Sequence, residues 1–450
     1  MPLDRLLRLA DEVAIEHTHQ TIATPMTEQP TTNMASPSPA LRTGLRQRVL
    51  VVAPAFPPVI GGAQRWAEEV ARALHEQGDS VMVLAPRQKG AAEHDAALPF
   101  PVRRCIVPGD AMVWSAIYPI DALLREFQPT MILAGHWSGA HAALRAAKGR
   151  VPVICAAHGR EIGYQPLRRF PSAQRIYDRA RRFAFDHADA FACVSGNTRR
   201  LMQEAGVEDE RLYVVWNGVD VRPFLSAAGT GLFERHGLLG RKVLLTVARQ
   251  VRRKGMDNVI RALPEMLRSR PELAYVLVGD GPDRARLERV AQECGVADSV
   301  LFLGSVSDQD VIDAYQTCDL FIMTARDELP DVEGFGLVFL EAGACGKPVV
   351  GSWAGGVPDA VVHEETGLLA DPHDCGEIAG AVLRILGDDA LALRLGAAGK
   401  RSACADRGWD MAAARFSHIF SQLSAQLPDA PHVPQRAHAA PPQLAPATGS

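Results

Sequence analysis

The sequence EGFGLVFLE at residues 333–341 carries two glutamates eight positions apart around a Gly-Phe-Gly turn. Glycines ahead of an apolar run are typical of a loop that opens a helix. The first amides of a helix lack partners within the helix, and its dipole is positive at that end, so phosphates bind there. Carboxylates have a different role, because they accept hydrogen bonds from sugar hydroxyls. The stretch therefore predicts a site for a ligand that carries phosphates and sugars.

Two cations, Arg249 and Lys254, follow an apolar strand predicted at residues 243–247. Arginine and lysine neutralise phosphates, and ligands of parallel sheets bind at the carboxyl ends of the strands. A basic loop is more often a solvated surface, but its place directly after a buried strand favours binding. We expect Arg249 and Lys254 to face the ligand, and Arg252 and Arg253 to point elsewhere. A diphosphate flanked by sugars is a nucleotide sugar, which is the ligand class that the two stretches predict together.

The composition narrows the class of protein. A chain of 450 residues is too long for one ordinary core, so two domains are expected. Hydrophobic residues make up 47%, and the net charge of −4 gives no reason to expect nucleic-acid binding. The eight cysteines are scattered singly, and no run of about 18 apolar residues occurs. We therefore expect a reducing, cytoplasmic location without a disulfide framework, a membrane span or a secretory signal.

Predicted strands and helices alternate in two series, which predicts an α/β fold with two doubly wound parallel sheets. The strands are expected at residues 48–53, 81–84, 131–134, 153–156, 190–194 and 213–215, and then at 243–247, 275–278, 300–303, 320–323 and 348–350. The expected segments are a disordered extension at 1–45 with a short helix at 4–17, a first domain at 46–220, a second domain at 221–408, a terminal helix at 409–426 and a disordered tail at 427–450.

Other loops at strand ends carry glycines or a histidine. Gly61 and Gly62 stand between a strand and a helix, where they let backbone approach a phosphate, although a tight turn without a ligand explains them equally well. Gly279 and Gly281 leave space near a ribose or base. His158 is placed to bond a sugar hydroxyl, although a lone histidine is more often structural. Their shared place at strand ends favours one common site.

Two neighbouring patterns have simpler interpretations. A second glycine turn at residues 354–359 is expected to support the 333–341 stretch. Arg160 and Glu161 are a local ion pair by one interpretation, and their role stays open. No Asp-x-Asp motif lies at a strand end, and neither HExxH nor GxxxxGK[ST] occurs, so we predict no metal and no other cofactor.

In this order and spacing, the motifs resemble the retaining, nucleotide-sugar-dependent glycosyltransferases of the GT-B fold in glycosyltransferase family 4 (glycosyl transferases group 1). The resemblance covers about residues 47–424. It implies two facing Rossmann-like domains with a cleft between them, the first for the acceptor and the second for the donor, and a C-terminal helix that crosses back to the first domain. The run 331–341 is most similar to bacterial mannosyltransferases that act on lipid-linked acceptors.

The resemblance assigns the donor diphosphate to residues of both domains. Arg249 and Lys254 would clamp it from the second domain, and the backbone at Gly61 and Gly62 would meet it from the first. The leaving group would be stabilised by these two cations and by the helix N-terminus near Gly336, an electrostatic role that is often the largest catalytic contribution.

The resemblance also assigns the sugars. Glu341 would bond the ribose hydroxyls, with the glycines of the 279–281 loop beside the nucleoside. Glu333 would hold the donor sugar, and His158 would reach that sugar across the cleft. The backbone amides that would assist Glu333 are those at Phe335, Gly336 and Leu337.

The implied activity is transfer of a hexose, with mannose favoured, from a GDP- or UDP-sugar to a hydroxyl of a glycan or a polyprenyl-diphosphate-linked acceptor in cell-envelope or exopolysaccharide synthesis. We expect retention by front-face attack, with the leaving phosphate accepting the acceptor's proton, because no carboxylate is placed as a nucleophile. The alternatives are a glycogen- or sucrose-synthase-like glucosyltransferase, a non-hydrolysing sugar epimerase, and a nucleotide-sugar-binding scaffold without turnover.

A basic segment at 167–182 contains six arginines and one acid, Asp178, interleaved with Phe170, Ile176 and Tyr177. A solvated surface helix is the simpler interpretation. The alternative is peripheral contact with an anionic membrane surface, which would suit lipid-linked acceptors.

Overall fold

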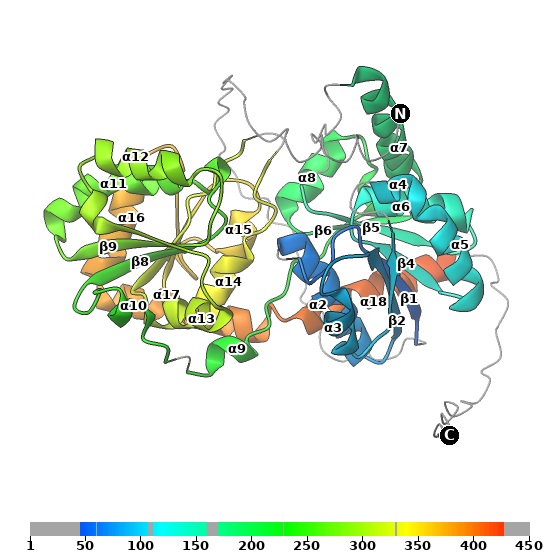
Figure 1. The fold of residues 1–450 in the computed structure, drawn as a ribbon, viewed down its shortest axis with the longest axis horizontal. Helices are drawn as coiled ribbons and strands as arrows, with labels where there is room; N and C mark the ends of the chain where they lie inside the picture. The colour runs from blue at the N-terminus through cyan, green and yellow to red at the C-terminus, as the bar shows by residue number, and fades with distance from the viewer. Residues whose placement is uncertain are drawn as a thin grey trace, which may run out of the picture.

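The computed structural model describes residues 46–59, 61–106, 111–159, 170–227, 229–328 and 331–426. Two lobes lie side by side, each built around a parallel sheet with helices on both faces (Figure 1). The predicted fold class of two doubly wound α/β units is confirmed. The helix predicted at 4–17, the two terminal segments and the pair Arg160 and Glu161 lie outside the described residues.

The first sheet has seven strands in the order β3-β2-β1-β4-β5-β6-β7, and all neighbours pair in parallel. The strands are β1 (Arg48–Val52), β2 (Ser80–Pro86), β3 (Val102–Cys105), β4 (Met131–Ala134), β5 (Val153–Ala157), β6 (Ala190–Cys193) and β7 (Leu212–Val214). Its helices are α2 (Gly62–Glu76), α3 (Ala91–Ala96), α4 (Met112–Ser115), α5 (Ile117–Glu126), α6 (Trp137–Ala147), α7 (Pro171–His187) and α8 (Gly196–Glu204).

The second sheet has six parallel strands in the order β10-β9-β8-β11-β12-β13. The strands are β8 (Lys242–Val247), β9 (Leu273–Val278), β10 (Val300–Gly304), β11 (Leu320–Ile322), β12 (Val349–Ser352) and β13 (Leu368–Ala370). Its helices are α9 (Arg222–Leu225), α10 (Leu232–Arg235), α11 (Met256–Ser269), α12 (Arg284–Glu293), α13 (Asp308–Thr317), α14 (Leu337–Ala344), α15 (Val357–Ala360), α16 (Cys375–Gly387) and α17 (Asp389–Ala405).

All eleven predicted strands form, with bounds that differ by at most two residues. The apolar runs predicted them well because strands buried on both faces have no polar side to show. In β1, for example, Leu50 and Val52 enter one core while Val49 and Val51 enter the core on the opposite face. The sequence missed β3 and β13, which are edge strands of their sheets.

The last helix, α18 (Trp409–Gln426), leaves the second lobe and packs on the first (Figure 1). Its residues Phe416 and Phe420 share a core with Trp66 of α2. The chain therefore crosses between the lobes twice, and the two crossings touch: Val219 N donates to Arg407 O at 2.7 Å. A Cβ on Gly218 would lie 2.5 Å from Trp409 N, so this close approach requires glycine.

Candidate functional site

The loops after β8 and β9 are packed against each other at the carboxyl edge of the second sheet. Gln250 N donates to Asp280 O at 2.9 Å, and Gln250 Nε2 donates to Gly279 O at 2.7 Å. A Cβ on Gly279 would lie 2.3 Å from Ala248 O, and one on Gly281 would lie 2.2 Å from Gln250 O. These glycines are thus required by the backbone of the basic loop, which is a different reason from the space near a ribose or base that the sequence suggested.

The basic loop brings two cations onto one carboxylate. After Arg249 the chain makes a 3₁₀ turn at Arg252–Lys254, and Lys254 Nζ donates to Glu333 Oε2 at 2.7 Å. Arg253 also donates to Glu333 Oε2. The prediction that Arg253 points elsewhere is therefore wrong, because the tight turn sends its side chain to the same side as Lys254.

Glu333 is almost fully buried at 8% exposure. Burial alone would raise its pKa, but the positive charges of Lys254 and Arg253 and their hydrogen bonds lower the pKa to about 2. The carboxylate is therefore ionised at neutral pH and accepts hydrogen bonds without donating a proton. This arrangement suits a group that binds hydroxyls better than one that acts as a general acid.

The 333–336 loop rests on the second glycine turn, as the sequence predicted. Gly356 N donates to Glu333 O at 2.8 Å. A Cβ on Gly356 would lie 2.0 Å from Gly334 O, and one on Gly355 would lie 2.4 Å from Glu333 O. The α14 helix then begins at Leu337, with Gly336 as its N-cap at φ 95°. The predicted helix opening is confirmed.

The same loop meets the first domain at His158. A Cβ on Gly334 would lie 2.4 Å from His158 O, and one on Gly159 would lie 2.9 Å from Val332 Cγ2. The His158 ring packs edge-on against Trp66 with centroids 5.0 Å apart, and its Nε2 lies 3.2 Å from Gly135 O. His158 is thus held beside the glutamate loop at the junction of the two domains.

Glu341 lies on α14 and is 7% exposed. Its Oε2 accepts a hydrogen bond from the Tyr315 hydroxyl of α13 at 2.8 Å. Burial and the neighbouring carboxylate raise the pKa of Tyr315, so this hydroxyl stays protonated and donates. Glu341 Oε1 accepts from Arg65 Nη1 at 2.7 Å, and Arg65 belongs to α2 of the first domain.

The remaining predicted residues fall around this junction. Gly61 and Gly62 precede Arg65 at the start of α2, and a Cβ on Gly62 would meet nothing within 4 Å. Phe335 is buried below the loop. Arg249 is exposed and forms no ion pair with a described residue, so the structure does not bring it onto the Glu333 cluster.

Sequence reasoning missed Arg65 and Tyr315. Tyr315 carried no signal, because a single aromatic residue in a helix is normally core. Arg65 carried a weak signal in the sequence. It stands about one helical turn after Gly61 and Gly62 and therefore lies near the end of α2 that a phosphate would approach.

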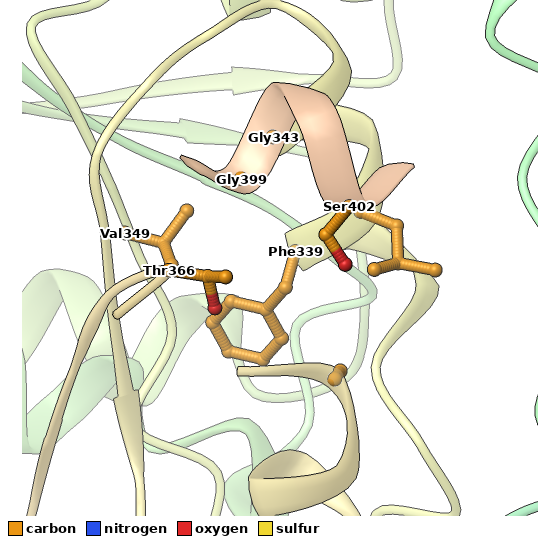
Figure 2. A pocket seen from close by; sticks show the side chains of 8 residues that line it. Phe339, Gly343, Val349, Thr366, Gly399 and Ser402 are labelled. Atoms are coloured by element: carbon orange, nitrogen blue, oxygen red, sulfur yellow. The ribbon is translucent and has the colours of Figure 1, made fainter. Parts of the chain in front are cut away.

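A small crevice lies elsewhere on α14 and is not the ligand site. Figure 2 shows the Phe339 ring beside Val349 and Thr366, with Gly399 and Ser402 of α17 across from it. Its lining carries no charged group, so it does not suit a diphosphate. Within the described part of the chain, no cluster of three or more His, Cys, Asp or Glu residues is arranged to hold a metal ion.

Comparison with known proteins places the chain in a family. Two sequence profiles match it: Glycosyl transferases group 1 at residues 232–402, and Glycosyltransferase Family 4 at residues 60–222. The GDP-mannose-dependent alpha-(1-6)-phosphatidylinositol monomannoside mannosyltransferase of Mycobacterium tuberculosis (strain ATCC 25618 / H37Rv) is 35% identical, over 82% of this chain and 97% of that protein. The protein of the same name from Mycolicibacterium smegmatis is 33% identical, over 83% and 98%.

The fold has counterparts among solved structures. HepE of Anabaena in complex with UDP-glucose aligns with a TM-score of 0.68 at 20% identity, over 85% of this chain and 100% of that one. Sucrose-phosphate synthase from Thermosynechococcus elongatus aligns with a TM-score of 0.68 at 22% identity, over the same shares.

Two Rossmann-like domains that meet at buried carboxylates paired with cations have the fold of the GT-B class of glycosyltransferases, as the solved structures also indicate. The sequence relatives then give the family. The chain belongs to glycosyltransferase family 4, the glycosyl transferases group 1, and is an enzyme that transfers a sugar from a nucleotide sugar to a glycan or lipid acceptor.

Proposed function

We propose that the enzyme transfers mannose from GDP-mannose, with retention of configuration, to a hydroxyl of a mannosylated phosphatidylinositol or a similar lipid-linked glycan. The sugar and acceptor follow the relatives named as GDP-mannose-dependent phosphatidylinositol mannoside mannosyltransferases. The observation that carries the catalytic proposal is the cluster that Lys254 and Arg253 form around the buried Glu333, beside His158 of the opposite domain. A scaffold without turnover would have no need to keep this cluster intact.

The cations have hydrogen-bonding capacity left for a diphosphate. Lys254 has three N–H donors and uses one on Glu333, so two remain for phosphate oxygens. Arg249 is unpaired among the described residues and is the second proposed clamp. The amides at the start of α14, after Gly336, and of α2, at Gly62, add partial positive charge from the two domains.

The proposed chemistry needs no carboxylate nucleophile, since Glu333 is held by two cations. The bond between C1 of the sugar and the phosphate oxygen breaks, and its electron pair goes to the leaving phosphate. The acceptor oxygen bonds to C1 on the same face, and its proton passes to that phosphate oxygen. Glu333 and His158 orient the sugar, and the diphosphate clamp stabilises the charge that develops.

We also propose peripheral contact with the membrane surface on the cytoplasmic side through α7. Arg175, Ile176 and Arg179 are exposed on this helix, which gives a basic face with an apolar side chain. Tyr177 does not belong to that face, because it is buried against Trp137 with ring centroids 4.6 Å apart. Among the described helices, none has both the length and the apolar character needed to cross a membrane.

The activity is tested with a panel of donors and acceptors. GDP-mannose, UDP-glucose, UDP-N-acetylglucosamine and ADP-glucose are offered with phosphatidylinositol monomannoside, with a polyprenyl-diphosphate-linked glycan, and with glycogen. We expect transfer from GDP-mannose to a lipid acceptor, with the anomeric configuration of the product retained in its NMR spectrum. Transfer of glucose to glycogen would support the glycogen-synthase-like alternative, which a 26% identical relative represents. Binding without turnover of any donor would favour the scaffold.

Membrane contact is tested by vesicle co-sedimentation of the double variant Arg175→Glu, Arg179→Glu. We expect it to lose binding to vesicles that contain phosphatidylinositol but to resemble the wild type with phosphatidylcholine alone. The double variant Lys400→Glu, Arg401→Glu changes two exposed cations of α17 by the same total charge and is the control. Equal loss in the control would assign the effect to net charge.

A further inference from the structure

The ion pair between Arg65 and Glu341 joins the two domains. Among the ion pairs of the described residues, it is the one that links a helix of the first sheet, α2, to a helix of the second, α14. The Glu341 side chain is 10% exposed and the Arg65 side chain is 42% exposed. The carboxylate is therefore part of the second domain's interior, and the guanidinium approaches it from outside.

The carboxylate is fixed from two directions and still has capacity to accept. Arg65 donates to Oε1 at 2.7 Å and Tyr315 donates to Oε2 at 2.8 Å. A carboxylate offers about four lone-pair sites, so one remains on each oxygen. Two acceptor sites on neighbouring oxygens match two adjacent hydroxyls, such as the 2′ and 3′ hydroxyls of a ribose.

We propose that Arg65 is a positioning residue that completes the ribose subsite from the opposite domain. This inference rests on the proposed role of Glu341 in binding the ribose. Arg65 fixes the Glu341 carboxylate in the orientation that leaves one acceptor site on each oxygen. It also neutralises the buried negative charge, which the uncharged ribose hydroxyls could not do alone. Glu341 has no other cation among the partners that the structure gives it.

A consequence is that nucleoside recognition and domain closure are coupled. When the domains separate, Glu341 loses Arg65 and keeps the neutral Tyr315. The ribose then meets a carboxylate that is held from one side only. By linkage, a ligand that binds more tightly to the closed arrangement than to the open one stabilises the closed arrangement by that difference in binding free energy. An intact ribose would therefore favour closure, whereas diphosphate alone would not engage this pair.

The test compares GDP with 2′,3′-dideoxy-GDP by calorimetry, with the UDP and ADP pairs measured in parallel. The proteins are the wild type, Arg65→Met, Arg65→Lys and the control Arg72→Met. Arg72 lies on the same helix and forms its ion pair locally, with Glu68 at 2.9 Å. Thermal unfolding without ligand checks that every variant is folded.

We expect the wild type to bind the dideoxy analogue at least about tenfold more weakly than GDP, since each hydrogen bond to a charged group is worth about tenfold or more. In Arg65→Met this ratio should shrink at least about threefold, while Arg72→Met keeps it and Arg65→Lys restores it in part. An unchanged ratio in Arg65→Met, with both ligands weakened equally, would overturn the proposal, because a merely structural contact does not distinguish the ligands.

The outcomes also separate this inference from the proposed function. If the wild type binds GDP but does not distinguish the dideoxy analogue, the ribose role of Glu341 is wrong and the inference fails, while the donor assignment stands. If none of the three nucleoside diphosphates binds, the donor assignment fails and the inference fails with it.

Discussion

Replacing Lys254 with methionine removes one charge from the cluster around Glu333 and keeps most of the side-chain length. Lys254 Nζ lies 2.7 Å from Glu333 Oε2, and both side chains are 11% exposed. Against the effect of burial, Lys254 and Arg253 lower the pKa of Glu333 from its usual 4.5 to about 2. The difference corresponds to about 3 kcal/mol after the opposing effect of burial is included, so the two cations together contribute more than this, and losing one of them should cost about 2 kcal/mol of stability or more.

Expressed as free energy, the expected loss of transition-state stabilisation is larger than this loss of folding stability. The N–H groups that Lys254 does not use on Glu333 are those proposed to stabilise the leaving diphosphate. Removing such a donor typically costs on the order of 10²–10³ in kcat. Since the charge develops only in the transition state, kcat should fall more than KM rises.

The assay measures nucleoside diphosphate release at saturating donor and acceptor, with urea unfolding in parallel. Arg252→Met is the matched control, because Arg252 is exposed on the same 3₁₀ turn. We expect the control to change kcat by less than about twofold. A fall of kcat by less than about threefold in Lys254→Met would remove Lys254 from the chemical step. An equal fall in both variants would point to a disturbed loop instead.

Three further predictions follow from the same contacts. Arg249→Ala should weaken nucleoside diphosphate binding by about tenfold in calorimetry and leave the ligand-free midpoint of unfolding unchanged, since Arg249 is exposed and unpaired among the described residues. The pKa of Glu333 is lower in the folded protein than in the unfolded chain, so its contribution to the free energy of unfolding is present above pH ~4.5 and is lost as the pH falls towards ~2. Urea unfolding should therefore show a loss of about 2 kcal/mol between pH ~6 and ~3. The variant Glu333→Gln should lack this pH-dependent loss. Gly356→Ala should cost about 1–3 kcal/mol in urea unfolding, because its Cβ would lie 2.0 Å from Gly334 O, whereas Gly62→Ala, with nothing within 4 Å, should keep the fold and weaken only phosphate binding.

The fold was predictable because its strands are buried on both faces. A strand such as β9, with every residue buried, shows as a continuous apolar run. The edge strand β3 has the sequence VRRC and is only partly buried, so no apolar run marks it. The edge strand β13 is buried and has only three residues, and it was missed although β7 and β11, which are equally short, were predicted. Incomplete burial therefore explains why β3 was missed, but it does not explain β13, whose residues are all buried.

The sequence predicted a site residue only where the position of its own strand and loop was enough to place it. The loops with Lys254 and Glu333 follow strands, and the carboxyl ends of parallel strands meet at one edge. Arg253 was assigned wrongly because a 3₁₀ turn of three basic residues does not reveal which side chains face inward. Arg65 and Tyr315 were missed because their contact with Glu341 depends on how two domains and two helices meet. No pattern within a single segment of the sequence predicts how these domains and helices pack together.

The charges at the junction bear on the proposed proton transfer. Glu333 with Lys254 and Arg253 carries a net charge of plus one, and Arg249, the second clamp proposed above, would add another when it binds the diphosphate. The diphosphate of a nucleotide sugar carries two negative charges, so donor and site are matched. When the bond to the sugar breaks, the leaving group gains a third charge that no group in this set balances. Taking the acceptor's proton returns the leaving group to two charges. This balance supports the leaving phosphate as the proton acceptor. A separate protein base would instead leave a third negative charge on the diphosphate, in a site whose positive charge matches only two.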